Sequence, residues 1–232
     1  PILPAESRRA SRRRSRATTL LFLATTNPRY VYRFYSAPQA AQLEEYMAWE
    51  GRYLQALPKA LRAAVLFRPH PLDFGHDLPA RLGPLAASFR WDRGRVPLQR
   101  RLRQCRLAVV DHLGTPFLEA LAANIPTVAF WDPQQWEVRG EVEPMLTQLR
   151  EVGVLWNSPE QAAEQTAMVA VDPWRWWGSA GVQQVRERFV ARYALARDDW
   201  RTPWTDALRQ ALAETARVMP GKRALKPVEA AS

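Results

Sequence analysis

Short apolar runs of strand-forming residues alternate along this chain with amphipathic helical segments. The expected strands cover residues 18–26, 63–71, 88–92, 106–111, 126–131 and 154–157, and the expected helices cover residues 36–57, 96–105, 115–124, 143–153 and a segment that starts at Ser158. Nearly all-apolar strands separated by helices are typical of a parallel sheet that helices cover on both faces. We therefore predict an α/β fold, a Rossmann-like doubly wound parallel sheet, over residues 18–171.

Residues 172–219 follow a different pattern. They are rich in tryptophan, and no strand pattern occurs in them. We predict that they form closing helices packed on the same domain. Within them, the segment "DPWRWWGS" (172–179) fits packing between helix and sheet better than stacking on a sugar.

The basic charge of the chain lies mainly at its two ends. Of the formal net charge of +10, residues 1–17 carry +5 and residues 220–232 carry +2, which leaves +3 for the body between them. Such ends are typical of solvated, disordered tails. Binding of RNA, DNA or anionic lipid through the arginine-rich end is the alternative.

Three further features restrict the class of protein. The single cysteine, Cys105, excludes an internal disulfide and an all-cysteine metal site. No run of about 18 uncharged apolar residues suggests a transmembrane helix. The single cysteine fits a reducing compartment, so we expect a cytoplasmic location, with peripheral contact to a membrane left open. The chain starts at Pro1, and no signal-peptide core follows the arginines, so we interpret it as a fragment or a processed piece.

Ligands of open α/β sheets bind at the carboxyl ends of the strands. Four segments of this chain follow directly after expected strands: Arg68 to His70, Asp111 to Thr115, Asp132 to Arg139, and Asn157 with Ser158. We therefore expect these four segments to contribute binding residues.

The segment Gly114-Thr115-Pro116 has the composition of a helix start that binds an anion. Pro116 suits the first helical position, Thr115 suits the capping position, and Gly114 permits close approach of a ligand. Free N–H groups of Phe117 and Leu118, together with the helix dipole, would then bind phosphate. The alternative is that Thr-Pro is only a good helix cap.

Glu119 lies about one turn inside this largely apolar helix. A carboxylate in such a place needs a partner. A ribose diol, which offers two hydroxyl donors, is one suitable partner. A salt bridge to one of the many arginines is the alternative.

Other polar residues at the ligand edge are weaker candidates. Arg68 and His70 suit phosphate binding or acid–base catalysis, with a purely superficial position as the alternative. Arg139 is a candidate clamp for a diphosphate, and His112 is either an assisting group or polar surface. The three histidines lack the spacing of a metal-ligand cluster, so we predict no metal site.

The segment "FLEALAANIPTVAF" (117–130) resembles the donor-binding segment of GT-B glycosyltransferases. The resemblance implies that Glu119 holds the ribose of a nucleotide sugar and that the helix N-terminus faces the diphosphate. It also implies catalysis without a bound metal or cofactor, by a base that lies in an N-terminal domain absent from this chain. Asn124 stands where many members have glycine, and asparagine tolerates the left-handed conformation needed there.

The wider set of "FRPHP", "LEALAANIPTV", "EPMLTQLREVGVLWNSPEQAA" and "DPWRWW" resembles a family of bacterial transferases linked to surface-polysaccharide and O-antigen synthesis, over residues 18–205. The resemblance implies the nucleotide-sugar-binding C-terminal half of a glycosyltransferase, with a glycan or lipid-linked acceptor as its other partner. Two alternatives stay open. They are a stand-alone Rossmann module that binds a nucleotide or a partner, and a nucleic-acid binder.

Overall fold

The computed structural model describes residues 19–28, 41–72, 74–195 and 199–218 of the chain. The chain divides into two compact units, residues 1–195 and residues 196–232. The strands of the first unit are β1 (Leu20–Leu23), β2 (Val65–Arg68), β3 (Arg90–Trp91), β4 (Leu107–Val110), β5 (Thr127–Phe130) and β6 (Leu155–Trp156). Its helices are α1 (Ala41–Ala56), α2 (Lys59–Ala63), α3 (Leu78–Leu82), the 3-10 helix η2 (Gly83–Ala87), α4 (Leu98–Gln104), α5 (Thr115–Ala122), α6 (Glu143–Glu151), α7 (Pro159–Val169), α8 (Pro173–Trp177) and α9 (Ala180–Tyr193). The second unit contains α10 (Arg201–Val218).

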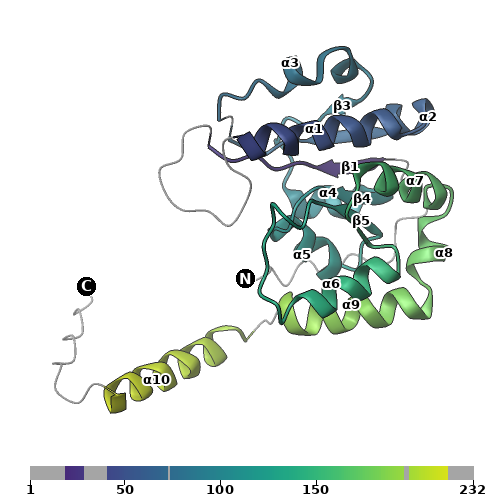
Figure 1. Cartoon of the computed structure of the whole chain (residues 1–232). Helices are drawn as coiled ribbons and strands as arrows, with labels where there is room; N and C mark the ends of the chain where they lie inside the picture. Colours follow the sequence, from purple (N-terminus) through teal and green to yellow (C-terminus); the bar gives the residue numbers. More distant parts are fainter. Residues whose placement is uncertain (1–18, 29–40, 73, 196–198, 219–232) are drawn as a thin grey trace. The chain divides into compact units, whose positions relative to one another are not determined.

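The six strands form one open sheet in the order β3-β2-β1-β4-β5-β6, and every neighbouring pair is parallel (Figure 1). This order is typical of the dinucleotide-binding Rossmann fold. The predicted fold class, a Rossmann-like doubly wound parallel sheet, is therefore confirmed. Each of the six predicted strands corresponds to a strand of this sheet.

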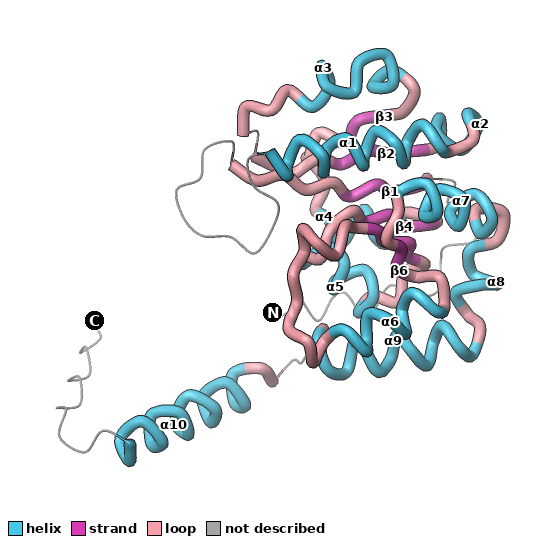
Figure 2. The backbone as a smooth tube through the Cα atoms, in the orientation of Figure 1, coloured by secondary structure: helices cyan, strands magenta, loops and turns pink. Residues whose placement is uncertain are grey.

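Helices cover the sheet on two faces (Figures 1 and 2). Side chains point alternately to the two sides of a strand. In β1, Leu20 and Phe22 join the cluster that includes residues of α1 and α7, whereas Leu21 and Leu23 join the cluster that includes residues of α5, α6 and α9. Both sets are buried, which is why the strand is apolar at every position.

Several predicted helix boundaries are present in the structure. Ser158 accepts a hydrogen bond from the backbone N–H of Gln161 at 3.4 Å and caps α7. Gly153, with a φ of 75°, lies just beyond the end of α6, and Asn124, with a φ of 51°, lies just beyond the end of α5. The predicted cap of the first helix, Ser36, lies outside the described residues.

The tryptophan-rich segment closes the face of the sheet on which α5 lies. α9 contacts α5, α6 and α8, and Trp177 of α8 is fully buried in the same cluster. The packing role predicted for "DPWRWWGS" is therefore confirmed for Trp177. The packing of residues 199–218 on this domain stays a prediction, because α10 belongs to the second unit.

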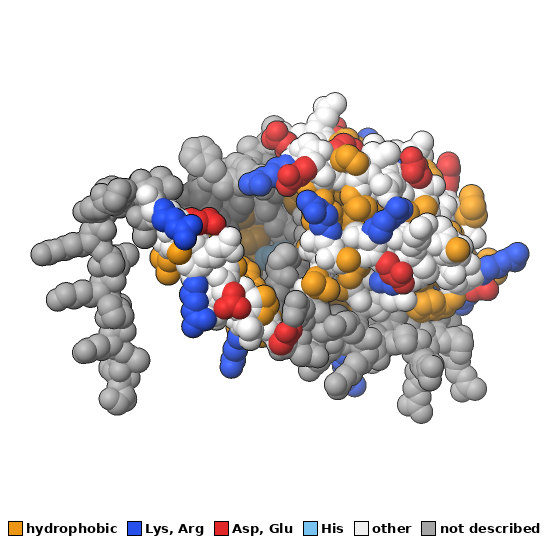
Figure 3. All heavy atoms as spheres, turned by 90° about the horizontal axis from the view of Figure 1, so that it is seen from below, with side chains coloured by type: hydrophobic (Ala, Val, Ile, Leu, Met, Phe, Trp, Pro, Cys, Tyr) orange, Lys and Arg blue, Asp and Glu red, His pale blue; other side chains and the backbone are white. Residues whose placement is uncertain are grey.

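Two further observations concern the surface. Among the residues that the structure describes, no helix combines the length and the apolar character that crossing a membrane requires. Among the described residues of the first unit that Figure 3 shows, lysine and arginine side chains are interspersed with acidic ones. The arginine-rich end on which the nucleic-acid alternative depends lies outside the described residues.

Candidate functional site at the carboxyl edge of the sheet

The order of the strands reverses between β1 and β4. The chain leaves β1 toward β2 and leaves β4 toward β5, in opposite directions along the sheet. Ligands of open α/β sheets bind in the crevice at such a switch point. The residues that follow these two strands, Thr25 and Thr26 after β1 and Asp111 and His112 after β4, therefore mark the candidate site.

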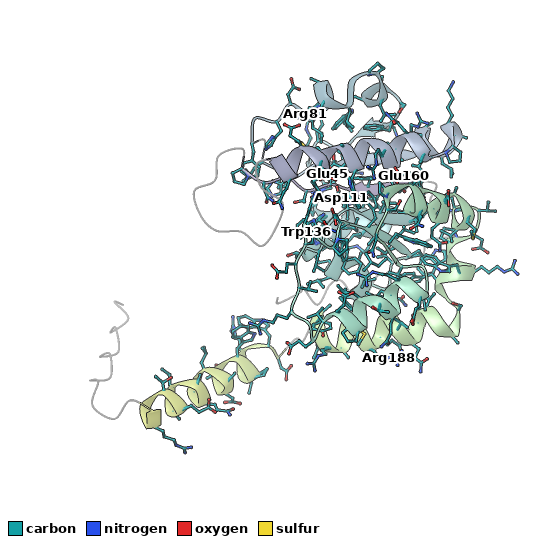
Figure 4. The ribbon with its side chains drawn as sticks, viewed as in Figure 1. Glu45, Arg81, Asp111, Trp136, Glu160 and Arg188 are labelled. Atoms are coloured by element: carbon teal, nitrogen blue, oxygen red, sulfur yellow. The ribbon has the colours of Figure 1, made fainter. Side chains whose placement is uncertain are left out.

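Asp111 lies at the centre of a buried polar cluster at this point. Nδ1 of His112 lies 2.8 Å from Oδ1 of Asp111, and the hydroxyl of Tyr46 donates to the backbone oxygen of Asp111 at 3.0 Å. Asp111 is fully buried and His112 is 5% exposed. In Figure 4, Asp111 lies beneath α1, between the labels of Glu45 and Trp136. The site therefore holds an aspartate–histidine pair shielded from water.

Glu50 of α1 belongs to the same cluster. Its side chain is fully buried and within hydrogen-bonding reach of the Asp111 carboxyl. Burial, and after it the charge and hydrogen bond of Asp111, raises the pKa of Glu50 well above its usual range. Burial likewise raises the pKa of Tyr46. Glu50 is a site residue that the sequence analysis missed, although it occupies a position of the apolar stripe of α1, between Tyr46 and Tyr53.

The start of α5 differs from the prediction. Thr115 is the first helical residue, and Gly114 occupies the capping position without a side-chain hydrogen bond. The N–H groups of Phe117 and Leu118 donate to the carbonyl oxygen of Gly114 at 3.1 and 3.3 Å. The predictions that Thr115 caps the helix and that these two N–H groups are free for phosphate are therefore wrong. The reason is that the helix starts one residue earlier than expected, so these two N–H groups of its first turn donate to the Gly114 carbonyl.

The structure gives Gly114 a role other than the predicted close approach of a ligand. A Cβ atom added at this position would lie 2.5 Å from Cδ2 and 2.9 Å from Nε2 of His112. Its φ of −148° is extended backbone that any residue adopts. Gly114 is therefore needed here because the His112 imidazole packs against it.

We expect Gly114→Ala to destabilise the protein by about 1–2 kcal/mol, because the added methyl group overpacks the site and displaces the imidazole. Urea denaturation followed by circular dichroism would measure the loss. In the background of His112→Ala, the same substitution should cost almost nothing, because the clashing ring is gone. An equal cost in both backgrounds would show that the ring does not lie against Gly114.

Glu119 lies on the side of α5 that faces α4. It is 6% exposed, and Nε2 of Gln99 lies 3.2 and 3.4 Å from its two carboxylate oxygens. Burial raises the pKa of Glu119, and the hydrogen bond from Gln99 opposes this shift. The partner that the structure gives to this carboxylate is an amide rather than one of the arginines.

A cavity of about 570 Å³ opens at the carboxyl ends of β1 and β2. Its lining includes Thr25, Thr26, Glu50, His70 and His76. Volumes of this size are typical of small-molecule sites. The cavity therefore connects the predicted candidate His70 with the buried cluster through Glu50.

The two histidines of the cavity are held by neighbouring groups. Nδ1 of His70 accepts a hydrogen bond from the N–H of Leu72 at 3.1 Å, and its ring stacks on Phe74. Nε2 of His76 lies 2.8 Å from the carbonyl oxygen of Asn27. The described residues contain no group of three or more histidine, cysteine, aspartate or glutamate side chains placed to hold a metal ion.

Arg68 is engaged in an ion-pair network away from this cavity. Its guanidinium donates to Oδ2 of Asp92 at 3.0 Å and to the carbonyl oxygen of Val96 at 2.7 Å, and Arg101 also pairs with Asp92. Burial alone raises the pKa of Asp92, but hydrogen bonds from Arg101 and Gly94 and the two guanidinium charges outweigh it and lower the pKa. The structure thus gives Arg68 a structural partner.

The sequence profile described as "LIC12162 family transferase" matches residues 2–208. The chain belongs to this family. No curated protein matches the sequence.

Two solved structures are similar to the structure of this LIC12162 family member. WaaG, a glycosyltransferase involved in lipopolysaccharide biosynthesis, is 14% identical, with 81% of this chain and 50% of that chain covered and a TM-score of 0.48. A UDP-forming α,α-trehalose-phosphate synthase from Burkholderia vietnamiensis is 15% identical, with 87% of this chain and 46% of that chain covered and a TM-score of 0.44. The chain spans about half the length of each of these structures.

The structure brings only some of the predicted site residues of this LIC12162 family member together. Asp111, Gly114 and Thr115 meet at the switch point with His112, and His70 lines the adjoining cavity. Arg139 is exposed in the loop that follows β5. Glu50 and Tyr46 complete the cluster from α1, 61 and 65 residues before Asp111 in the sequence.

Proposed function

We propose that this LIC12162 transferase moves a sugar from a nucleotide-activated donor to a glycan or lipid-linked acceptor. The donor would lie at the carboxyl edge of the sheet, between the start of α5 and the loop that carries His70. The observation that carries the proposal is the cavity of about 570 Å³ beside the switch point of a β3-β2-β1-β4-β5-β6 sheet in a chain that belongs to a transferase family.

Two further features support a nucleotide donor. The positive end of the α5 dipole lies at the switch point, where the field of a helix N-terminus favours an anion such as a diphosphate. The carboxylate of Glu119 has acceptor capacity beyond the single amide of Gln99, which suits ribose hydroxyls.

The pathway and the second domain are parts of the same proposal. The resemblance of "LEALAANIPTV" and "FRPHP" to transferases of surface-polysaccharide synthesis supports a glycan product. This chain would act as the donor-binding half of a GT-B-type enzyme, and a second domain would contribute to the binding of the acceptor.

A second candidate function is a stand-alone nucleotide-binding module. It is favoured by the sheet of residues 19–195, whose two faces are both buried beneath helices of the same unit. Such a module would bind a nucleotide but would not transfer a sugar when the nucleotide sugar is supplied with an acceptor.

The full chain should bind a nucleoside diphosphate about tenfold more tightly than the matching nucleoside, because the positive end of the α5 dipole favours the charge of the diphosphate by roughly 1–2 kcal/mol. Isothermal titration calorimetry with UDP, GDP, CDP and ADP, each against its nucleoside, would measure this difference. Equal affinities in all four pairs would refute a phosphate site at this edge.

A further inference from the structure

We propose that Glu50, Asp111 and His112 form a hydrogen-bonded chain that fixes the His112 imidazole with its proton on Nδ1. Nε2 of His112 is then presented as the proton acceptor for the hydroxyl group of the acceptor substrate. The acceptor role rests on the proposed function. Glu50 and Asp111 act in this chain as positioning residues.

The first link is the bond between Asp111 and His112. Nδ1 lies 2.8 Å from Oδ1 of a fully buried carboxyl. A carboxylate oxygen only accepts, so Nδ1 carries the hydrogen and donates it. In the neutral ring the lone pair then belongs to Nε2. Within the described residues, Nε2 has no protein hydrogen bond, and it lies beside Gly114 at the start of α5.

The second link is the contact between the two carboxyl groups. Three buried oxygens of these two groups have no hydrogen-bond donor among the described residues: both side-chain oxygens of Glu50 and Oδ2 of Asp111. Two carboxyl groups in one buried site do not both ionise readily. A single shared proton supplies the donor for a hydrogen bond between them. Burial, and after it the charge and the hydrogen bond of Asp111, raises the pKa of Glu50 well above its usual range, which agrees with a proton shared between the two carboxyl groups.

Both hydrogen bonds of the chain therefore end on the carboxyl group of Asp111. Glu50 donates to Oδ2 of Asp111, and Asp111 accepts at both side-chain oxygens. The hydroxyl of Tyr46 donates to the backbone oxygen of Asp111 and holds this residue against α1. The charge of Glu50 also acts on Tyr46, and His70 and His76 line the same cavity as Glu50.

The location of the ring fits a role in transfer. The imidazole packs against Gly114 at the start of α5, and its centroid lies 6.0 Å from that of Trp136. Glu50, at the other end of the chain, lines the cavity at β1 and β2. The hydrogen-bonded chain therefore joins the cavity to the helix N-terminus where the diphosphate is proposed to lie.

The transfer step balances with these groups. The acceptor hydroxyl gives its proton to Nε2 of His112 while its oxygen forms a bond to the sugar carbon. The bond from that carbon to the diphosphate oxygen breaks, and its electron pair leaves with the nucleoside diphosphate. The resulting imidazolium is stabilised by the carboxylate of Asp111, which does not itself take up the proton.

Nitrogen-15 NMR of the histidine rings in the full chain tests the arrangement directly. The chain has three histidines, so His70→Gln and His76→Gln variants assign the His112 signals. We expect a protonated Nδ1 and an unprotonated Nε2 at a pH where the ring is neutral. A His112 ring with its hydrogen on Nε2 would overturn the proposal.

Two matched variants separate positioning from mere packing. In Asp111→Asn, protonated Glu50 donates to the amide oxygen, and the amide NH₂ turns toward Nδ1, so the ring hydrogen should move to Nε2. In Glu50→Gln, the new amide still donates to Asp111, so Nδ1–H should persist. If Asp111→Asn leaves the ring hydrogen on Nδ1, Asp111 does not position the ring. If Glu50→Gln moves the hydrogen to Nε2, Glu50 does not act as the donor to Asp111.

These outcomes are distinct from those of the nucleotide titration. Equal affinity for nucleoside and nucleoside diphosphate would refute the proposed donor site, whatever the state of the ring. An Nε2–H ring in a protein that binds diphosphates tightly would refute only the hydrogen-bonded chain.

Discussion

Replacing Trp177 by alanine should lower the free energy of unfolding by about 3–5 kcal/mol. Trp177 is fully buried between α8 and the helices that cover one face of the sheet. Its indole N–H donates to Oδ1 of Asn124 at 2.7 Å. The substitution therefore removes a large apolar surface, leaves a cavity, and deprives Asn124 of one hydrogen-bond partner.

Urea denaturation followed by circular dichroism would measure this loss against two controls. Trp177→Phe keeps an aromatic ring but deletes the hydrogen bond, so it should cost less than the alanine variant. Met168→Ala, on the same unit, changes a side chain that is 76% exposed and should stay within about 0.5 kcal/mol of the wild type. A Trp177→Ala variant as stable as Met168→Ala would contradict the packing described for α8.

Trp177 and Asn124 show which features of the fold could be predicted from the sequence and which could not. Asn124 was expected to adopt the left-handed conformation, and it does so. Its side chain bonds to an indole 53 residues away. The local conformation follows from the properties of asparagine. The partner could not be predicted, because it depends on how α8 packs after the sheet has formed.

The strands were predictable because burial on both faces demands apolar residues at every position of a strand. The short helices α2, α3 and η2 were not predicted. Each has five residues, too few for a periodic pattern, and each has a proline at its start or directly before it. Sequence patterns thus identify the layers of this fold better than its connections.

The candidate site was only partly predictable for a related reason. The rule that ligands bind at strand ends selected Asp111 and His70. The same rule does not reach Glu50, whose contact with Asp111 arises when α1 packs over β4. Its one signal is a glutamate within the apolar stripe of α1, where burial is expensive without a partner. The start of α5 was misplaced by a single residue, a common error for helix ends.

Glu119→Ala should weaken nucleoside diphosphate binding by about 1.5–3 kcal/mol and leave the fold intact, because a charged hydrogen bond to the ribose is lost. This corresponds to roughly a tenfold to 150-fold rise in the dissociation constant. Calorimetry with the diphosphate that binds best, together with urea denaturation of the same sample, would measure both quantities. The carboxyl is buried against α4, so the second measurement is necessary.

Gln99→Ala is the matched control for Glu119→Ala. Gln99 is the side chain that donates to the Glu119 carboxylate, so its removal takes away the same protein–protein hydrogen bond but keeps the ribose acceptor. If Glu119 binds the ribose, Gln99→Ala should retain most of the affinity, whereas Glu119→Ala should not. If instead both variants lose stability alike and bind the nucleotide as the wild type does, the bond between Glu119 and Gln99 serves only to join α4 to α5. The ribose would then have to be held by another group at the carboxyl edge of the sheet.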